Sequence, residues 1–174
     1  MGSRMRAAAA RNKIQPLHRL VGIVRRAATR GRRVVFTNGC FDLLHAGHVK
    51  LLEHAKRQGE LLIVGINGDR SVRALKGPGR PILPQRDRAL LLAALQAVDY
   101  VTIFNERTPL RLIERLQPDV LMKGSDWSTA QIVGGAVVRR TGGRVVRYPL
   151  LKGYSTTRLI ERIRRGGRPQ GRKS

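Results

Sequence analysis

The chain has 174 residues, 41% of them apolar, and 35 Lys and Arg against 11 Asp and Glu give a formal net charge of +24. This length suits one folded domain with one core, and the absence of any apolar run near the ~20 residues that cross a bilayer argues against a membrane protein. A single cysteine, Cys40, excludes an intramolecular disulfide framework and a thiol-based zinc site, so we expect a soluble, cytoplasmic protein.

The ends of the chain differ from its middle in composition. Residues 1–12 combine an apparent tag remnant with an alanine run too short for a signal peptide, and we expect a disordered arm there. Residues 166–174 are basic and rich in glycine, and we expect a disordered tail. The folded domain is therefore expected over residues 13–165.

The first half of the folded region alternates helical and strand patterns. Apolar residues at helical spacing over 17–27 predict an amphipathic helix before the core. The β-branched run at 34–36 predicts a buried strand that ends in a turn at 37–39. A helix is expected over about 47–57, and the apolar run 61–66 predicts a parallel strand covered on both faces.

The second half continues the alternation after a long polar segment. Residues 67–84 are rich in Gly, Pro, Arg and Lys and predict a loop with at most a short helix, which in a compact domain is more often functional than structural. Thr108 and Pro109 suit the start of a helix. Helices are expected over 87–97, 108–116, 128–140 and 155–165, and strands over 100–104, 119–122 and 144–148.

Strands that alternate with helices predict a parallel sheet covered by helices on both faces, a single-domain, Rossmann-like α/β/α sandwich. Ligands of such sheets bind outside the carboxyl ends of the strands. We therefore expect the functional residues in the segments that directly follow strands: 37–48, 67–80, 123–127 and 152–157.

The most informative segment is 37–48, which reads TNGCFDLLHAGH. His45 and His48 are three residues apart at the start of a predicted helix, so both side chains lie on one face. The free N–H groups and the dipole of the helix start favour an anion, and Gly47 lets a phosphate approach the backbone. A metal site with Asp42 is the alternative, although helical metal-binding histidine pairs are more usually four residues apart. The bland alternative is one core histidine and one surface histidine.

This segment resembles the signature of the cytidylyltransferase-like superfamily of nucleotidylyltransferases, in which an HxGH motif binds the phosphates of a nucleoside triphosphate. Within it, the chain is most similar to the heptose 1-phosphate adenylyltransferases, which make the lipopolysaccharide precursor ADP-heptose, alone or as the C-terminal half of a bifunctional kinase–transferase. The likeness runs from about residue 33 to 163. Four more stretches carry it: KGPGRP at 76–81, AALQAVDY at 93–100, KGSDW at 123–127 and STT at 155–157.

The resemblance implies transfer of AMP from ATP to a sugar 1-phosphate by in-line attack on the α-phosphorus, with pyrophosphate as the second product. It also implies a homodimer, and Mg²⁺ that enters with the triphosphate without a protein ligand. The implied catalytic residues are His45, His48, Lys76 and Lys123. The implied ATP-binding residues are Thr37, Asn38, Gly39, Cys40, Phe41, His45, Gly47, His48, Lys123, Gly124, Asp126, Ser155, Thr156 and Thr157. The implied acceptor-binding residues are Asp42, Lys76, Arg80 and Arg88.

Several of these residues also have ordinary structural explanations. Ser155 and Asp126 suit helix caps, Asp42 suits a turn, and any one basic residue among 35 is usually a solvated side chain. The closest functional alternative keeps the chemistry and changes the acceptor, to glycerol 3-phosphate with CTP, or to a flavin or pantetheine phosphate with ATP.

The charge of +24 has three explanations. A basic surface binds nucleic acid by releasing counterions, attracts small polyanionic substrates, or reflects arginine-rich composition on solvated faces. Aromatic residues make up only 4% of the chain and leave little material for stacking bases, which argues against a nucleic-acid partner.

Overall fold

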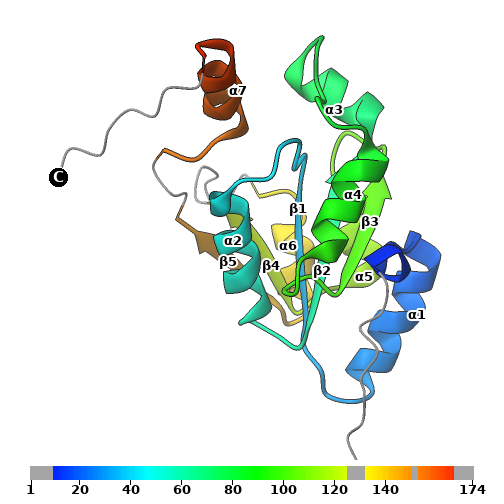
Figure 1. Ribbon diagram of the computed structural model, residues 1–174. Coiled ribbons are helices and arrows are strands. Elements are labelled where there is room, and N and C mark those ends of the chain that lie inside the picture. The colour runs from blue at the N-terminus through cyan, green and yellow to red at the C-terminus, as the bar shows by residue number, and fades with distance from the viewer. Residues whose placement is uncertain (1–9, 125–131, 150–152, 167–174) are drawn as a thin grey trace, which may run out of the picture.

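One parallel five-stranded sheet forms the centre of the computed structural model, which describes residues 10–124, 132–149 and 153–166. The strand order is β3-β2-β1-β4-β5 (Figure 1). The strands are β1 (Val34–Gly39), β2 (Leu61–Asn67), β3 (Tyr100–Phe104), β4 (Val120–Gly124) and β5 (Arg144–Tyr148). The helices are the 3₁₀ helix η1 (Ala10–Lys13) and α1 (Leu17–Ala28), α2 (Ala46–Lys56), α3 (Asp69–Lys76), α4 (Gln85–Ala94), α5 (Leu110–Leu116), α6 (Gly135–Arg140) and α7 (Thr156–Arg164).

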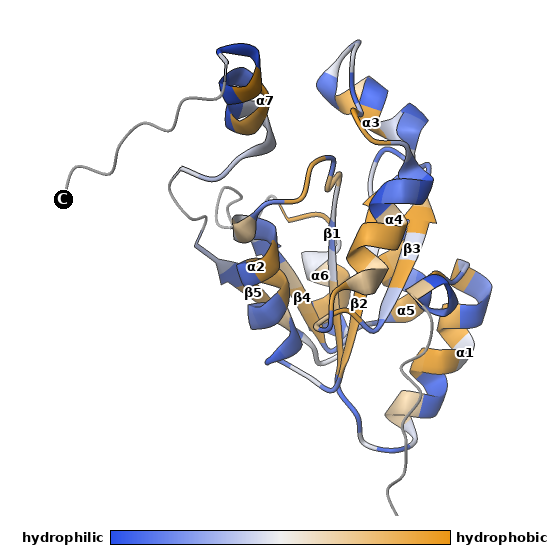
Figure 2. Ribbon diagram, in the orientation of Figure 1, coloured by the Kyte–Doolittle hydropathy of each residue, from blue (hydrophilic) through white to orange (hydrophobic). Residues whose placement is uncertain are grey.

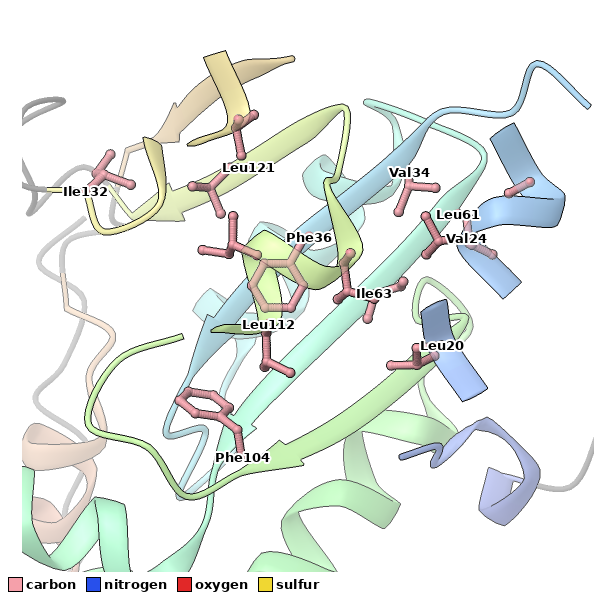
Figure 3. Close-up of a cluster of buried hydrophobic side chains, with 14 residues drawn as sticks. Leu20, Val24, Val34, Phe36, Leu61, Ile63, Phe104, Leu112, Leu121 and Ile132 are labelled. Carbon is pink, nitrogen blue, oxygen red and sulfur yellow. The ribbon is translucent and has the colours of Figure 1, made fainter. Parts of the chain in front are cut away.

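Helices cover both faces of the sheet, because side chains alternate between the faces along each strand. Val34 and Phe36 of β1 belong to the core that α1, α5 and α6 complete (Figure 3). Val35, between them, belongs to a second core with residues of α2 and α4. Figure 2 shows apolar residues gathered on the strands and on the inner sides of the covering helices. The expected single-domain α/β/α architecture is confirmed.

The apolar face of α1 packs onto the protein's own sheet. Leu20, Val24 and Ala27 are buried in the core beside β1 and β2. This apolar face is therefore already covered within the protein's own core.

Most predicted elements are present, although several of their bounds differ. The predicted turn at 37–39 is wrong, because these residues pair with β2 and continue β1 to Gly39. The part of the predicted helix 128–140 that the structure describes becomes helical only at Gly135, after Gly134 with a φ of 83°. Residues 10–12 of the expected disordered arm belong to η1, whereas residues 1–9 and the tail 167–174 lie outside the described residues.

The strand order reverses direction at β1, since the chain places β2 and β3 on one side of it and β4 and β5 on the other. A crevice at the carboxyl ends of the two strands that flank such a reversal is the usual ligand site of this architecture. Here those strands are β1 and β4, so the segments that follow them carry the candidate site. Among the described residues, no helix has the length and apolarity that crossing a membrane requires.

Candidate functional site

The two histidines of the motif lie side by side where the chain leaves β1 and enters α2. His45 is the N-cap residue of α2, with extended backbone, and its carbonyl accepts a hydrogen bond from the His48 N–H at 2.9 Å. Their imidazole rings stack with centroids 3.8 Å apart and planes inclined by 17°. The predicted common face is therefore present, at a helix start that offers unpaired N–H groups to an anion.

The ring pair and the carboxyl end of β1 carry buried polar atoms without a partner. His45 Nδ1, His48 Nδ1 and the side-chain oxygen of Asn38 are all buried and have no hydrogen-bond partner among the described residues. An unpaired buried polar atom costs about 1–3 kcal/mol, so three of them in one place indicate a site that a ligand completes.

Both imidazoles are neutral in the free protein at physiological pH. Burial lowers the pKa of His48 to about 4, and the neighbouring His45 adds to that lowering. Burial also lowers the pKa of His45, against a smaller raising effect of its backbone hydrogen bond. The pair therefore offers neutral hydrogen-bonding groups rather than two positive charges.

Small residues give the rings their space. A Cβ at Gly47 would lie 3.0 Å from His45 Nδ1 and 3.0 Å from the Tyr154 Cβ, and a Cβ at Gly39 would lie 3.2 Å from the Phe41 ring. Phe41 has a φ of 46° and is buried, with its ring centroid 5.0 Å from that of His48. The glycines of the motif thus allow the close packing of Phe41 and the histidines.

The other predicted ATP-binding residues of the motif line the end of β1. Thr37 is buried within the strand, and Asn38, Gly39 and Cys40 are half-buried at its carboxyl end. The Cys40 thiol lies 3.9 Å from the side-chain oxygen of Asn67. Burial raises the pKa of this thiol, which favours the neutral thiol over the thiolate.

Asp42 fixes the loop between α3 and α4. Its carboxylate is buried and accepts hydrogen bonds from the Arg80 guanidinium at 2.5 Å and from the backbone N–H groups of Ile82 at 2.7 Å and Leu83 at 3.0 Å. These bonds tie the loop that carries the KGPGRP stretch to the motif. Asp42 therefore contacts the loop instead of an open acceptor site.

Arg88 is a second residue that links separate segments of the chain, and it has no exposed surface. Its guanidinium donates to the Leu83 carbonyl at 3.0 Å, the Cys40 carbonyl at 2.6 Å and Asp69 Oδ1 at 2.7 Å. It thereby joins the loop after β1, the start of α3 and the loop before α4. Protein groups therefore hold the Arg88 guanidinium on all sides, and direct contact with an acceptor would require this loop to open.

Lys76 and Lys123 approach the site from different elements. Lys76 is exposed at the end of α3, and its charge, like those of Arg88 and Arg80, acts against the raised pKa of Cys40. Lys123, followed by Gly124 at the end of β4, donates to the Asn38 carbonyl at 3.4 Å. The two lysines therefore flank the end of β1, and Asp126 lies outside the described residues.

The STT stretch lies at the start of α7, beyond the carboxyl end of the sheet (Figure 1). The Ser155 hydroxyl caps this helix by accepting from the Arg158 N–H at 3.1 Å, and Thr156 and Thr157 form its first turn. The preceding Tyr154 has its ring centroid 6.2 Å from that of His45. Residues far apart in sequence thus meet around one ring pair.

Tyr154 lies in the segment 152–157 where functional residues were expected, but it was not among the implied binding residues. It was passed over because an aromatic residue before a serine-rich helix start has no motif of its own. Its place directly before the STT stretch was the available signal.

The chain was compared with known proteins on this basis. The sequence profile of the cytidylyltransferase-like family matches residues 36–162. The bifunctional protein HldE of Geotalea uraniireducens is 56% identical over 154 residues, which are 88% of this chain and 31% of that protein. HldE of Magnetococcus marinus is 59% identical over 133 residues, covering 76% of this chain and 27% of that protein. The chain thus spans about a third of the length of these relatives.

Solved structures give the same fold. The lipopolysaccharide core biosynthesis protein of Thermoplasma volcanium superposes with a TM-score of 0.59 at 26% identity, over 72% of this chain and 100% of that one. The pantoate–β-alanine ligase of Francisella tularensis superposes with a TM-score of 0.57 at 14% identity, over 80% of this chain and 67% of that one. The second likeness shows a shared fold only.

Proposed function

The chain belongs to the cytidylyltransferase-like family, and from that premise we propose that it is an adenylyltransferase that transfers AMP from ATP to a heptose 1-phosphate, releasing pyrophosphate and an ADP-sugar. The identity to HldE proteins supports this acceptor. The observation that carries the triphosphate site is the group of buried, unpartnered polar atoms on Asn38, His45 and His48 at the start of α2. Triphosphate oxygens would accept hydrogen bonds from the two Nδ1 atoms where these carry the ring proton, and a hydroxyl or amino group of the nucleotide would donate to the Asn38 oxygen.

The proposed ATP site extends from this group along the two central strands. The end of β1 at 37–41, the start of α2, Lys123 and Gly124 of β4, and Asp126 would surround the nucleotide. The hydroxyls and N–H groups at 155–157 would hold the outer phosphates, as helix starts commonly do. Support comes from Tyr154, whose ring lies beside His45.

The proposed acceptor side lies along the loop between α3 and α4. Lys76 and Arg80 would attract the sugar phosphate, since both lie near the end of β1. Asp42 and Arg88 would act as positioning residues, because their hydrogen bonds hold this loop against the motif. Loss of either is therefore expected to affect the acceptor side through the loop.

Magnesium would enter with the triphosphate. Among the described residues, no three His, Cys, Asp or Glu side chains form a group that could hold a metal ion. Bound Mg²⁺ neutralises phosphate charge in reactions of this class.

The proposed mechanism needs no covalent intermediate and no general base. The attacking sugar-phosphate oxygen is already an anion, so the protein has to align it with the α-phosphorus and stabilise the charge on departing pyrophosphate. His45 and His48 would do this as neutral hydrogen-bonding groups. Lys76 and Lys123 would supply the positive charge, since a lysine binds phosphate as a point charge.

Pyrophosphate release tests the proposal. The protein is given ATP and Mg²⁺ with each anomer of a heptose 1-phosphate, with glycerol 3-phosphate and with pantetheine phosphate, and CTP replaces ATP in a parallel series. Release with ATP and one heptose anomer is the expected result. Release with CTP and glycerol 3-phosphate, or with a different acceptor only, would replace the substrate and keep the reaction class, and no release would contradict the activity.

A matched pair of variants tests the role of the motif. His48→Ala is expected to lower kcat about 100- to 1000-fold, as the loss of one preorganised donor does in other enzymes. The control is His54→Ala, because His54 lies on the same helix and packs its ring 4.9 Å from that of Tyr148, outside the motif. Equal activity of the two variants would exclude His48 from catalysis.

We further propose a cytoplasmic homodimer with no nucleic-acid partner. Sedimentation at several protein concentrations tests the dimer, and a monomer throughout would exclude it. The surface that joins the subunits would lie elsewhere than the covered face of α1.

A further inference from the structure

A cavity with a basic lining lies at the amino ends of the strands, opposite to the end of the sheet that carries the histidines. It has a volume of about 760 Å³ and lies between one side of α1, the segment around η1, and the amino ends of β2 and β3. Leu61 and Tyr100, the first residues of those strands, form part of its wall. The six residues of β1, about 20 Å of strand at ~3.3 Å per residue, separate this end of the sheet from the histidines.

We propose that this cavity, which we call the α1 groove, binds a small molecule carrying two or more phosphate groups, at a site separate from the triphosphate site of the motif. Its volume is within the range of roughly 300–1,000 Å³ typical of small-molecule sites. Nothing in the proposed transferase reaction requires it.

Positive charge dominates the lining of the α1 groove. Lys13, Arg19, Arg26 and Arg32 contribute cationic side chains, against one carboxylate, that of Asp99. No ion pair among the described residues involves Arg19, Arg26 or Arg32. Three arginines without an ion-pair partner around one cavity favour a ligand of multiple negative charge, because arginine pairs with phosphate through two parallel hydrogen bonds.

The one acidic group is already occupied. Asp99 Oδ2 accepts from Lys56 Nζ at 2.5 Å and from the Leu62 N–H at 2.7 Å. Lys13 Nζ is fixed in turn by the carbonyls of Leu95 at 3.2 Å and Val98 at 2.9 Å. The local carboxylate therefore does not neutralise the arginines, and Lys13 holds its charge in place.

Gly22 makes room along the middle of the groove. It faces the cavity from α1, and a Cβ built there would lie 3.5 Å from Arg26 Nη1, so the guanidinium lies across the glycine. Glycine inside a helix costs about 1 kcal/mol relative to alanine. Here the missing side chain lets the Arg26 guanidinium lie close to the helix backbone at the cavity wall.

The remaining wall suits the organic part of a ligand. Ile23 and Leu61 supply apolar surface and Tyr100 an aromatic ring. Nucleotides combine an aromatic base with a phosphate chain, so the groove fits a nucleoside polyphosphate as well as a simple polyphosphate. Comparing ATP with inorganic tripolyphosphate distinguishes these two sources of phosphate.

Equilibrium dialysis of the full chain measures how many equivalents of ATP and of tripolyphosphate bind. Wild type is expected to bind a second equivalent of ATP beyond that of the motif site. Arg19→Ala/Arg26→Ala should weaken this second equivalent at least tenfold and leave pyrophosphate release unchanged. The control, Arg25→Ala/Arg30→Ala, removes the same charge from exposed arginines outside the groove and should bind like wild type.

A charge-neutral variant separates the cavity from the general positive field. Gly22→Leu fills the groove without changing the charge, and leucine is a better helix former than glycine, so α1 should persist. Loss of the second equivalent in this variant would support the groove. The proposal would be overturned if Gly22→Leu bound the second equivalent like wild type. It would also be overturned if both double variants weakened binding of that equivalent equally.

Two further results separate this inference from the proposed function. His48→Ala should lose the motif equivalent and keep the groove equivalent, even if no acceptor supports turnover. A single equivalent in wild type would overturn the inference, as would displacement of the groove ligand by a single-stranded RNA that binds more tightly than either phosphate probe.

Discussion

His48 should bind the triphosphate as a neutral imidazole, although the motif suggests a cationic clamp. Burial, together with the adjacent His45, holds the pKa of His48 at about 4 in the free protein. A change of pH tests whether His48 stays neutral when the triphosphate binds. At a pH above this pKa, binding of a triphosphate to a protonated His48 would include the free-energy cost of protonating the imidazole.

The magnitude follows from the distance between the pH and that pKa. At pH 8, four units above it, protonation of His48 would cost about 5 kcal/mol at 1.36 kcal/mol per unit. A hydrogen bond to a charged partner contributes only about 1.5–3 kcal/mol. Since the cost exceeds the gain, the neutral form is the one that binds.

Isothermal titration calorimetry measures the proton count directly. ATP and Mg²⁺ are titrated into the protein at pH 8 without acceptor, in two buffers of different ionisation enthalpy. At this pH the terminal phosphate of ATP is already ionised, so it contributes no proton of its own. We expect the same binding heat in both buffers.

A buffer-dependent heat that corresponds to uptake of one proton, and that disappears in His48→Ala, would refute the reasoning. A companion variant gives an independent reading. His48→Asn keeps a neutral hydrogen-bonding group and should retain more activity than His48→Ala. Equal activity of the two would contradict the neutral-donor role.

Two further outcomes follow from the same contacts. The pKa of His48 falls from 6.5 in the unfolded chain to about 4 in the fold, so the unfolded state takes up the proton first as the pH drops. Urea unfolding should therefore show a loss of up to about 3 kcal/mol in the free energy of unfolding between these two pH values. The same dependence of stability on pH in His48→Ala would contradict this. Asp42→Ala leaves Arg80 unpaired in a largely buried position and should lower the free energy of unfolding by about 3–5 kcal/mol. We expect a lower melting temperature and a raised KM for the acceptor. Asp87→Ala, which removes an exposed carboxylate, should change neither value.

Periodicity predicted the sheet well because buried parallel strands are short apolar runs. Strands β3 and β5 have the bounds expected from the sequence. The end of β1 was missed because Asn38 and Gly39 are turn formers by composition. Pairing of these residues with β2 outweighs that local preference.

The site was predictable where one short segment carries it. The histidine pair and its helix start follow from spacing alone, and the stacked rings confirm the common face. The contacts of Asp42 and Arg88 did not follow, because they join residues that are 40 and 48 positions apart in the chain. The sequence does not distinguish an arginine that is fully buried and held by three hydrogen bonds, such as Arg88, from one that lies in solvent.

The central position of β1 also sets a condition on synthesis of the chain. β1 pairs with β4 through Val35 and Val120, partners separated by most of the folded region. Until the ribosome has synthesised β4, the edge of β1 that pairs with it has no hydrogen-bonding partner, and such unpaired edges promote aggregation. A chain truncated before β4 should therefore require a chaperone to stay soluble. We also expect the pairing of β1 with β4 to form late in folding, because such long-range pairing is slow.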